Sequence, residues 1–80
     1  MKGDITTLSY IQVHEVGKSD SGKTLRFEVR HESGAVLGWI YWFPRWRKYI
    51  YHPKPTTVYE ETCLNEIAEF IKTKTAEHNT

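Results

Sequence analysis

The sequence predicts an α+β domain in which an antiparallel β-sheet of three to five strands carries one C-terminal α-helix on one face. Within residues 5–59, short segments that alternate between polar and apolar residues are separated by turn residues, as is typical of antiparallel strands. From about residue 61 to residue 75, apolar residues recur with helical spacing. The 80 residues suit a single domain, 1–80, with the sheet over about 5–59 and the helix over about 61–75.

Residues 5–16 are rich in β-branched and aromatic residues, which predicts the first strand. Their alternation breaks at Tyr10–Ile11, so we expect a bulge or a register change there.

Residues 17–23 then form a polar turn. The run from Gly17 to Thr24 matches the spacing of a phosphate-binding P-loop, but a P-loop follows a buried parallel strand and opens a helix. Because the next segment alternates like a strand, we interpret this run as a hairpin loop.

Residues 24–31 give the clearest strand, in which Leu25, Phe27 and Val29 alternate with charged residues and therefore mark the buried face. The connection at Glu32–Gly34 leaves two registers open, because a slip of one residue exchanges the faces of the next strand. A two-residue loop, which we favour, buries Val36, Gly38, Ile40 and Trp42. A three-residue loop with a glycine bulge buries Leu37, Trp39 and Tyr41 instead.

Pro44 suits the first central position of a turn over residues 43–46, and residues 46–52 form the next expected strand. Residues 52–55 are expected to be an extended connector at a sheet edge, because each proline lacks a backbone donor. Residues 56–59 are three β-branched residues and a tyrosine, which favours a short strand. The alternative is a capping box in which Thr57 and Glu60 start the helix.

The expected helix presents one apolar stripe, and a single helix covers only part of a sheet. The uncovered face would be available to a ligand or to a second subunit, including a homodimer formed through this open face. Residues 76–80 are expected to fray. The stripe consists of Leu64, Ile67, Ala68 and Ile71, flanked by Cys63 and Phe70.

The segment Ala35–Tyr51 concentrates aromatic and basic residues, and no Asp or Glu lies between Glu32 and Glu60. Aromatic rings stack on bases, while Arg and Lys bind phosphates. We therefore predict a non-enzymatic binding module for nucleic acid or a signalling nucleotide. The same surface would also suit a protein–protein inhibitor or adaptor, because Trp, Tyr and Arg dominate protein interfaces. The predicted ligand-binding residues are Arg26, Trp39, Tyr41, Arg45, Trp46, Arg47, Lys48, Tyr49 and Tyr51.

The remaining residues give no signal for catalysis, and we predict no catalytic residue, metal site or cofactor. The four histidines lack zinc-finger spacing relative to one another and to Cys63. Cys63 flanks the apolar stripe and is expected to be buried and inert. A single cysteine excludes an intrachain disulfide, and no apolar run is long enough for a signal peptide or a membrane span. We expect a cytoplasmic protein without a membrane partner.

Four spaced segments within residues 25–71 resemble a group of small uncharacterised bacterial and phage proteins. The segments are Leu37-Gly38-x-Ile40-x-Trp42, Trp46-Arg47-x-Tyr49, Pro53-x-Pro55-x-Thr57-Val58 and Cys63-Leu64-x-Glu66-Ile67-x-x-Phe70-Ile71. The resemblance implies a sheet-plus-helix unit and a phage or mobile-element setting. Small phage accessory proteins of this kind act against host defence, by binding a defence protein or by sequestering its nucleotide signal. The resemblance supplies no catalytic motif.

Overall fold

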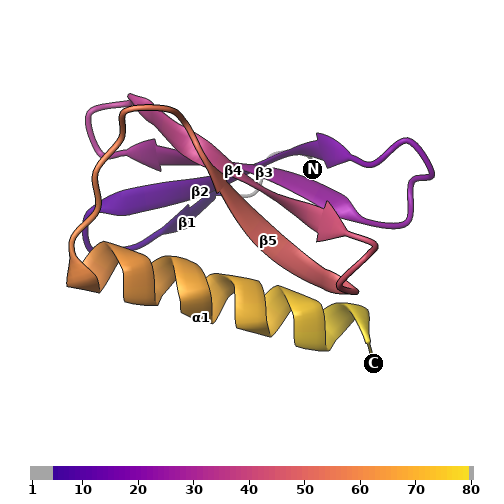
Figure 1. Ribbon diagram of the computed structural model, residues 1–80. Coiled ribbons are helices and arrows are strands. Elements are labelled where there is room, and N and C mark those ends of the chain that lie inside the picture. Colours follow the sequence, from indigo (N-terminus) through magenta and orange to yellow (C-terminus); the bar gives the residue numbers. More distant parts are fainter. Residues whose placement is uncertain (1–4, 80) are drawn as a thin grey trace.

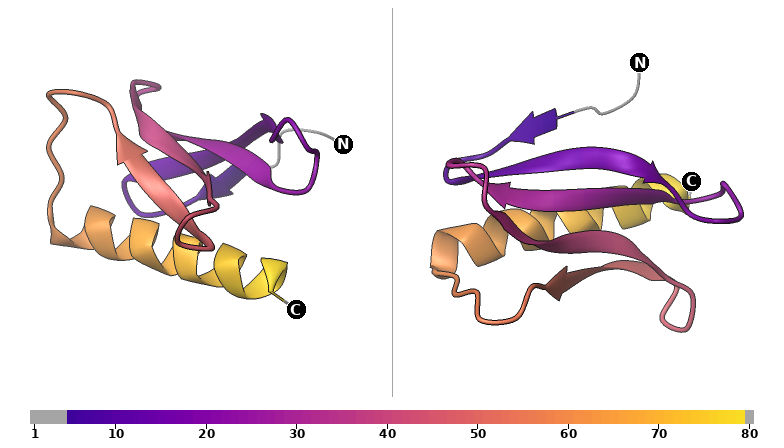
Figure 2. Two further views of the ribbon diagram at one scale, coloured as in Figure 1. Left: turned by 45° about the vertical axis from the view of Figure 1, so that its right-hand side comes forward. Right: turned by 90° about the horizontal axis from the view of Figure 1, so that it is seen from above.

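The alternating segments form five strands that hairpins join in chain order in the computed structural model, which describes residues 5–79 (Figure 1). Each strand pairs antiparallel with its sequence neighbour, so the sheet order is β1-β2-β3-β4-β5. One helix crosses a single face of this twisted sheet and packs mainly on β5 (Figure 2). The predicted α+β architecture is confirmed. The elements are β1 (Ile5–Thr7), β2 (Ile11–Lys18), β3 (Leu25–His31), β4 (Val36–Phe43), β5 (Lys48–Pro53) and α1 (Glu61–His78).

The single strand expected over residues 5–16 is wrong, because the break in its alternation marks a tight hairpin between β1 and β2. The Leu8 N–H donates to the Ile11 carbonyl over 2.8 Å and closes this turn. Strand β2 then continues to Lys18, and a loop closed by the Ser19 N–H and the Thr24 carbonyl (2.9 Å) leads into β3. The P-loop-like spacing therefore lies in an antiparallel hairpin, as interpreted from the sequence.

The β3–β4 hairpin combines a three-residue loop with one extra residue in β4. The His31 N–H donates to the Ala35 carbonyl (2.8 Å), and Gly34 has a φ of 98° in the loop. Arg30 lies opposite Val36, but Val29 lies opposite Gly38, so Leu37 forms a bulge.

The bulge restores the faces that we predicted, although the two-residue loop that we favoured is wrong. Ile40 lies opposite Phe27 and is fully buried with it, whereas Trp39 lies on the other face of the sheet. Val36 is a correction, because it pairs with Arg30 on the outer face while the bulged Leu37 packs against the core.

The core lies between the sheet and the helix and is closed by aromatic rings. The Phe27 ring meets the Phe70 ring of the helix edge to face, with centroids 5.1 Å apart. The Tyr49 ring also packs edge to face on the Phe27 ring, with the two ring centroids 6.1 Å apart. Such rings bury large apolar areas, which suits a chain of this length. The buried hydrophobic residues are Ile11, Val13, Phe27, Val29, Ile40, Tyr49 and Ile67.

Glu60, and not Thr57, caps the start of the helix. Its carboxylate accepts the Cys63 N–H over 2.7 Å, and this hydrogen bond holds the pKa of the carboxyl below its ordinary value. Residues 56–59 form no strand, so both expectations for this segment are wrong. The Thr57 hydroxyl instead donates to the Lys54 carbonyl (2.7 Å) within the connector.

The helix is longer than expected, and its buried face is rotated from the predicted stripe. Leu64 is 51% exposed and Ala68 is also exposed, whereas Ile67 is buried and Phe70 packs on the core. The reason is that the large rings of the sheet, and not helix periodicity alone, determine which side of the helix is covered. The fraying expected from residue 76 onward is wrong as far as His78, because the helix continues to that residue and the ring centroids of His78 and Trp42 lie 4.2 Å apart. Residue 80 lies outside the described residues.

The bulge at Leu37 also anchors the connector that leads to the helix. The Leu37 carbonyl accepts the Lys54 N–H and the Tyr59 hydroxyl, each over 2.8 Å. The Tyr59 hydroxyl also bonds to that of Tyr51, and burial, followed by this hydrogen bond, raises the pKa of Tyr51 above its ordinary value. Gly38 makes room for this arrangement, since a Cβ there would lie 2.5 Å from both the His52 carbonyl oxygen and the Tyr51 hydroxyl.

Replacing Gly38 by alanine should therefore destabilise the fold by about 1–3 kcal/mol, because a backbone oxygen blocks the added methyl group. Urea unfolding measures the effect as a fall in the midpoint. Gly17→Ala is the matched control in another strand, since its Cβ would meet no atom within 4 Å, and should change stability by no more than about 0.5 kcal/mol. Equal midpoints for the two variants would show that β4 and β5 are not so closely apposed.

Candidate functional site

The face of the sheet opposite the helix carries a hollow of about 500 Å³. The register places Arg26 opposite Tyr41, and Trp39 opposite both Glu28 and His52. Directly opposed side chains share a face, so three neighbouring strands contribute to one site. The hollow brings together two aromatic residues, a histidine, a cation and a carboxylate.

The walls of the hollow are formed by the rings of Trp39, Tyr41 and His52. The Tyr41 hydroxyl and His52 Nδ1 are 3.1 Å apart and share a hydrogen bond. The His52 ring centroid is 6.1 Å from that of Trp39 and 6.2 Å from that of Tyr41. These contacts fix the orientation of the rings before any ligand arrives, which lowers the entropy lost on binding.

The charges in the hollow leave Arg26 as its exposed cation. Glu28 is neutralised by Arg30, whose Nε donates to Glu28 Oε1 over 2.6 Å. Arg26 is 53% exposed in its side chain and lies 3.8 Å from Asp20, which is fully exposed. Such a solvent-exposed ion pair contributes little, so Arg26 is accessible to a competing anion.

The turn after β4 and the first residue of β5 extend this surface with four further residues. The N–H groups of Trp46 and Arg47 donate to the Phe43 carbonyl over 3.1 and 2.9 Å and close the turn, so β5 begins at Lys48 and not at Trp46. Trp46 is 63% exposed, and its ring packs edge to face on Phe43 at 4.8 Å. Arg45, Arg47 and Lys48 are all exposed around it.

The turn residues lie at one end of the aromatic row that crosses the open face. Phe43 follows Trp39 and Tyr41 at intervals of two residues in β4, and Lys48 lies opposite it. We define the basic–aromatic face as Arg26, Trp39, Tyr41, Phe43, Arg45, Trp46, Arg47, Lys48 and His52.

Tyr49 and Tyr51 are corrections to the predicted site, because both lie on the side of the sheet that the helix covers. Tyr49 lies opposite Trp42, is 4% exposed, and its hydroxyl accepts the Leu25 N–H over 3.0 Å. Tyr51 lies opposite the buried Ile40. The sequence prediction grouped Tyr49 and Tyr51 with Lys48 in one site, but successive residues of a strand point to opposite faces, and of these three only Lys48 lies on the open face.

Several residues of the open face were missed from the sequence, among them His52, Glu28 and Val16, which line the hollow, and Phe43. His52 shares a face of β5 with Lys48, a predicted site residue, and this alternation was the signal that could have found it. Glu28 comes from the neighbouring strand β3, so a segment that is free of acids in sequence has a carboxylate beside it in space.

The described residues 5–79 contain one free thiol and no cluster of metal-ligand side chains. Cys63 is half-buried, and burial raises the pKa of its thiol, which disfavours the reactive thiolate. Within the same residues, no three His, Cys, Asp or Glu side chains are close enough to hold a metal ion. Helix α1, the one helix among residues 5–79, is not apolar enough to span a membrane.

Comparison with known proteins gives one informative relative. The chain is 33% identical over 69 residues to the "Uncharacterized 9.3 kDa protein" of Acholeplasma phage L2. The aligned stretch covers 85% of this chain and 87% of the phage protein. A phage relative agrees with the setting that the sequence resemblance implied. No family model and no solved structure matches the chain.

The opposite placement of two tyrosines of adjacent strands can be tested by removing one hydroxyl from each. Tyr49→Phe leaves the Leu25 N–H without its partner in a partly buried position and should cost about 1–2 kcal/mol. Tyr41→Phe, the matched control, removes a hydroxyl whose partner His52 is exposed and should change stability by about 0.5 kcal/mol or less. Urea unfolding compares them, and a larger loss in Tyr41→Phe would contradict the assignment of faces.

Proposed function

The chain belongs to the same family of small proteins as the Acholeplasma phage L2 protein, and from this premise we propose that it is a non-enzymatic binding module for a phosphate-bearing ligand. The ligand would be a nucleic acid strand or a signalling nucleotide. The observation that carries this proposal is the hollow on the open face, where Trp39, Tyr41 and Arg26 meet in one site of about 500 Å³.

The basic–aromatic face offers the two kinds of contact that such a ligand requires. A base would stack on Trp39 or Tyr41 in the hollow, or on the exposed ring of Trp46 at the turn. Its phosphates would be held by Arg26 on one side and by the cations of the turn on the other. Arg26 lies beside Tyr41 and Lys48 lies beside Phe43, so a strand of several nucleotides that follows the row in β4 could contact both groups of cations.

The hydrogen bonds of the hollow would hold its side chains in place for binding. Glu28 is held by Arg30, and His52 shares a hydrogen bond with Tyr41. The same bonds would keep the recognition surface rigid.

We propose that the spacing Leu37-Gly38-x-Ile40-x-Trp42 serves the fold of this chain. The bulge requires the first residue, the close approach of Tyr51 requires Gly38, and Ile40 fills the core. In a phage setting, a module of this kind would serve as an accessory protein, and capture of a host nucleotide signal is the anti-defence role that we propose for it.

Fluorescence anisotropy with a labelled oligothymidine of about 12 nucleotides, and competition by a cyclic dinucleotide, test the proposal. Arg45→Ala combined with Arg47→Ala should weaken binding about tenfold or more. It should also reduce the slope of log affinity against log salt by about 1.4, since each phosphate contact with a single strand contributes about 0.7.

Lys23→Ala combined with Lys72→Ala is the matched control, because it removes the same charge from exposed positions outside the basic–aromatic face. It should leave most of the affinity and the slope intact. Equal losses in the two double variants would mean that binding follows net charge and not this site. Absence of binding to either probe, with retention of a protein from a nuclease-treated lysate, would favour the inhibitor or adaptor role instead.

A further inference from the structure

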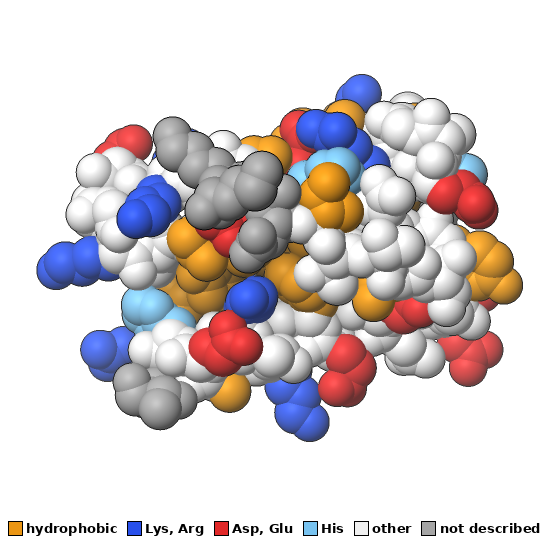
Figure 3. All heavy atoms as spheres, turned by 180° about the vertical axis from the view of Figure 1, so that it is seen from behind, with side chains coloured by type: hydrophobic (Ala, Val, Ile, Leu, Met, Phe, Trp, Pro, Cys, Tyr) orange, Lys and Arg blue, Asp and Glu red, His pale blue; other side chains and the backbone are white. Residues whose placement is uncertain are grey.

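A second hollow, of about 520 Å³, lies between helix α1 and the short edge strand β1, on the side of the sheet away from the basic–aromatic face. Seen from behind the molecule, hydrophobic side chains are gathered in the gap between sheet and helix, with acidic and basic side chains at its rim (Figure 3). The hollow exists because α1 packs mainly on β5, at the opposite edge of the sheet. We call it the α1–β1 groove.

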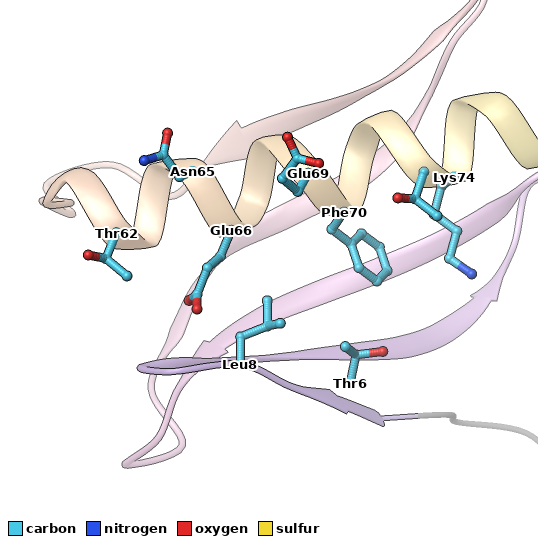
Figure 4. Close-up of a pocket in the computed structure, with 9 residues that line it drawn as sticks. Thr6, Leu8, Thr62, Asn65, Glu66, Glu69, Phe70 and Lys74 are labelled. Carbon is cyan, nitrogen blue, oxygen red and sulfur yellow. The ribbon is translucent and has the colours of Figure 1, made fainter.

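The α1–β1 groove has an apolar floor and an acidic wall. Leu8 points from the turn after β1 toward the helix, and Phe70 points from the helix toward the sheet (Figure 4). Glu66 and Glu69 lie along the helix on the same groove. An apolar floor beside carboxylates is suited to a group that has an aliphatic stem and a positively charged end.

One carboxylate oxygen of Glu66 has no hydrogen-bond partner among residues 5–79. Its Oε2 accepts the Ser9 N–H over 3.0 Å, which fixes the carboxylate between the helix and the β1–β2 turn. Its Oε1 is buried and has no hydrogen-bond partner within the described residues. Figure 4 shows the carboxylate extending from the helix toward Leu8. A buried carboxylate oxygen without a donor is costly, so a donor supplied from outside would be bound favourably.

The cation of the groove itself does not serve Glu66. Lys74 lies eight residues further along the helix, which is about 12 Å at 1.5 Å per residue. Its ammonium group pairs with Glu77 Oε1 at 3.2 Å and lies 5.6 Å from the centroid of the Phe70 ring. Lys74 is therefore neutralised at the far end, and the Glu66 end of the groove keeps its negative charge.

We propose that the α1–β1 groove binds a lysine or arginine side chain presented by an extended segment of a partner protein. The charged end pairs with the Glu66 carboxylate, whose buried Oε1 meets the donor after a small rotation of the side chain, and the aliphatic stem lies over Leu8 and Phe70. A protein segment fits this place because β1 is an end strand of the sheet, so its outer edge offers backbone groups for pairing beside the groove. This site and its partner are independent of the ligand proposed for the open face.

The test is an NMR titration with the capped peptide Thr-Val-Lys-Val-Thr and with the same peptide carrying acetyl-lysine. The unmodified peptide should give saturable shifts at the Ser9 amide and along the groove side of α1, and acetylation should weaken binding at least tenfold. Glu66→Gln should also weaken it at least tenfold, since it removes the charge but keeps an oxygen for the Ser9 N–H. Glu61→Gln, an exposed position on the same helix outside the groove, should leave the affinity within twofold.

Several results would overturn the proposal. They are the absence of saturable shifts at millimolar peptide, equal binding of the acetylated peptide, and equal losses in Glu66→Gln and Glu61→Gln. Tighter binding of free spermidine than of the peptide would show a small-amine site and would likewise refute a protein partner. The Arg45→Ala and Arg47→Ala double variant should bind the peptide normally, which separates this test from that of the open face.

Discussion

The extra residue at Leu37 is the constraint on which the rest of the structure depends. A three-residue loop alone would turn Trp39 and Tyr41 toward the helix and expose Ile40, because side chains alternate along a strand. The bulge shifts the register once more, so that Ile40 lies opposite Phe27 in the core. Gly38, directly after it, allows β5 to pass close enough for Tyr51 to reach the inner face.

The same bulge also positions the helix, and through the helix it shapes the α1–β1 groove. Its carbonyl holds the connector through Lys54 and Tyr59, and the connector leads directly to the helix cap at Glu60. A helix that starts there packs on β5 and leaves the β1 edge of the sheet partly uncovered. One local irregularity in β4 therefore sets the residues of the basic–aromatic face and the presence of the α1–β1 groove.

Local patterns in the sequence predicted what is local in the structure, and failed where distant residues decide. Alternation in β3 correctly marked Phe27 and Val29 as buried, since each strand carries that signal within itself. Tyr49 and Tyr51 of β5 were assigned to the wrong face of the sheet. The face of each depends on pairing with β4 across a turn whose length the sequence did not specify. The buried side of the helix was misjudged for a similar reason, since the position of the helix on the sheet leaves Leu64 51% exposed.

The two hollows differ in charge and lie on opposite faces of the sheet, which has a consequence for binding. The open face has Arg26 and the cations of the turn, whereas the groove has Glu66 and Glu69. An anionic ligand and a basic protein segment would therefore be attracted to different sides of the molecule and would not compete sterically. If both proposed sites are occupied as we propose, the rigidly packed core would let this single domain hold two unlike partners at once.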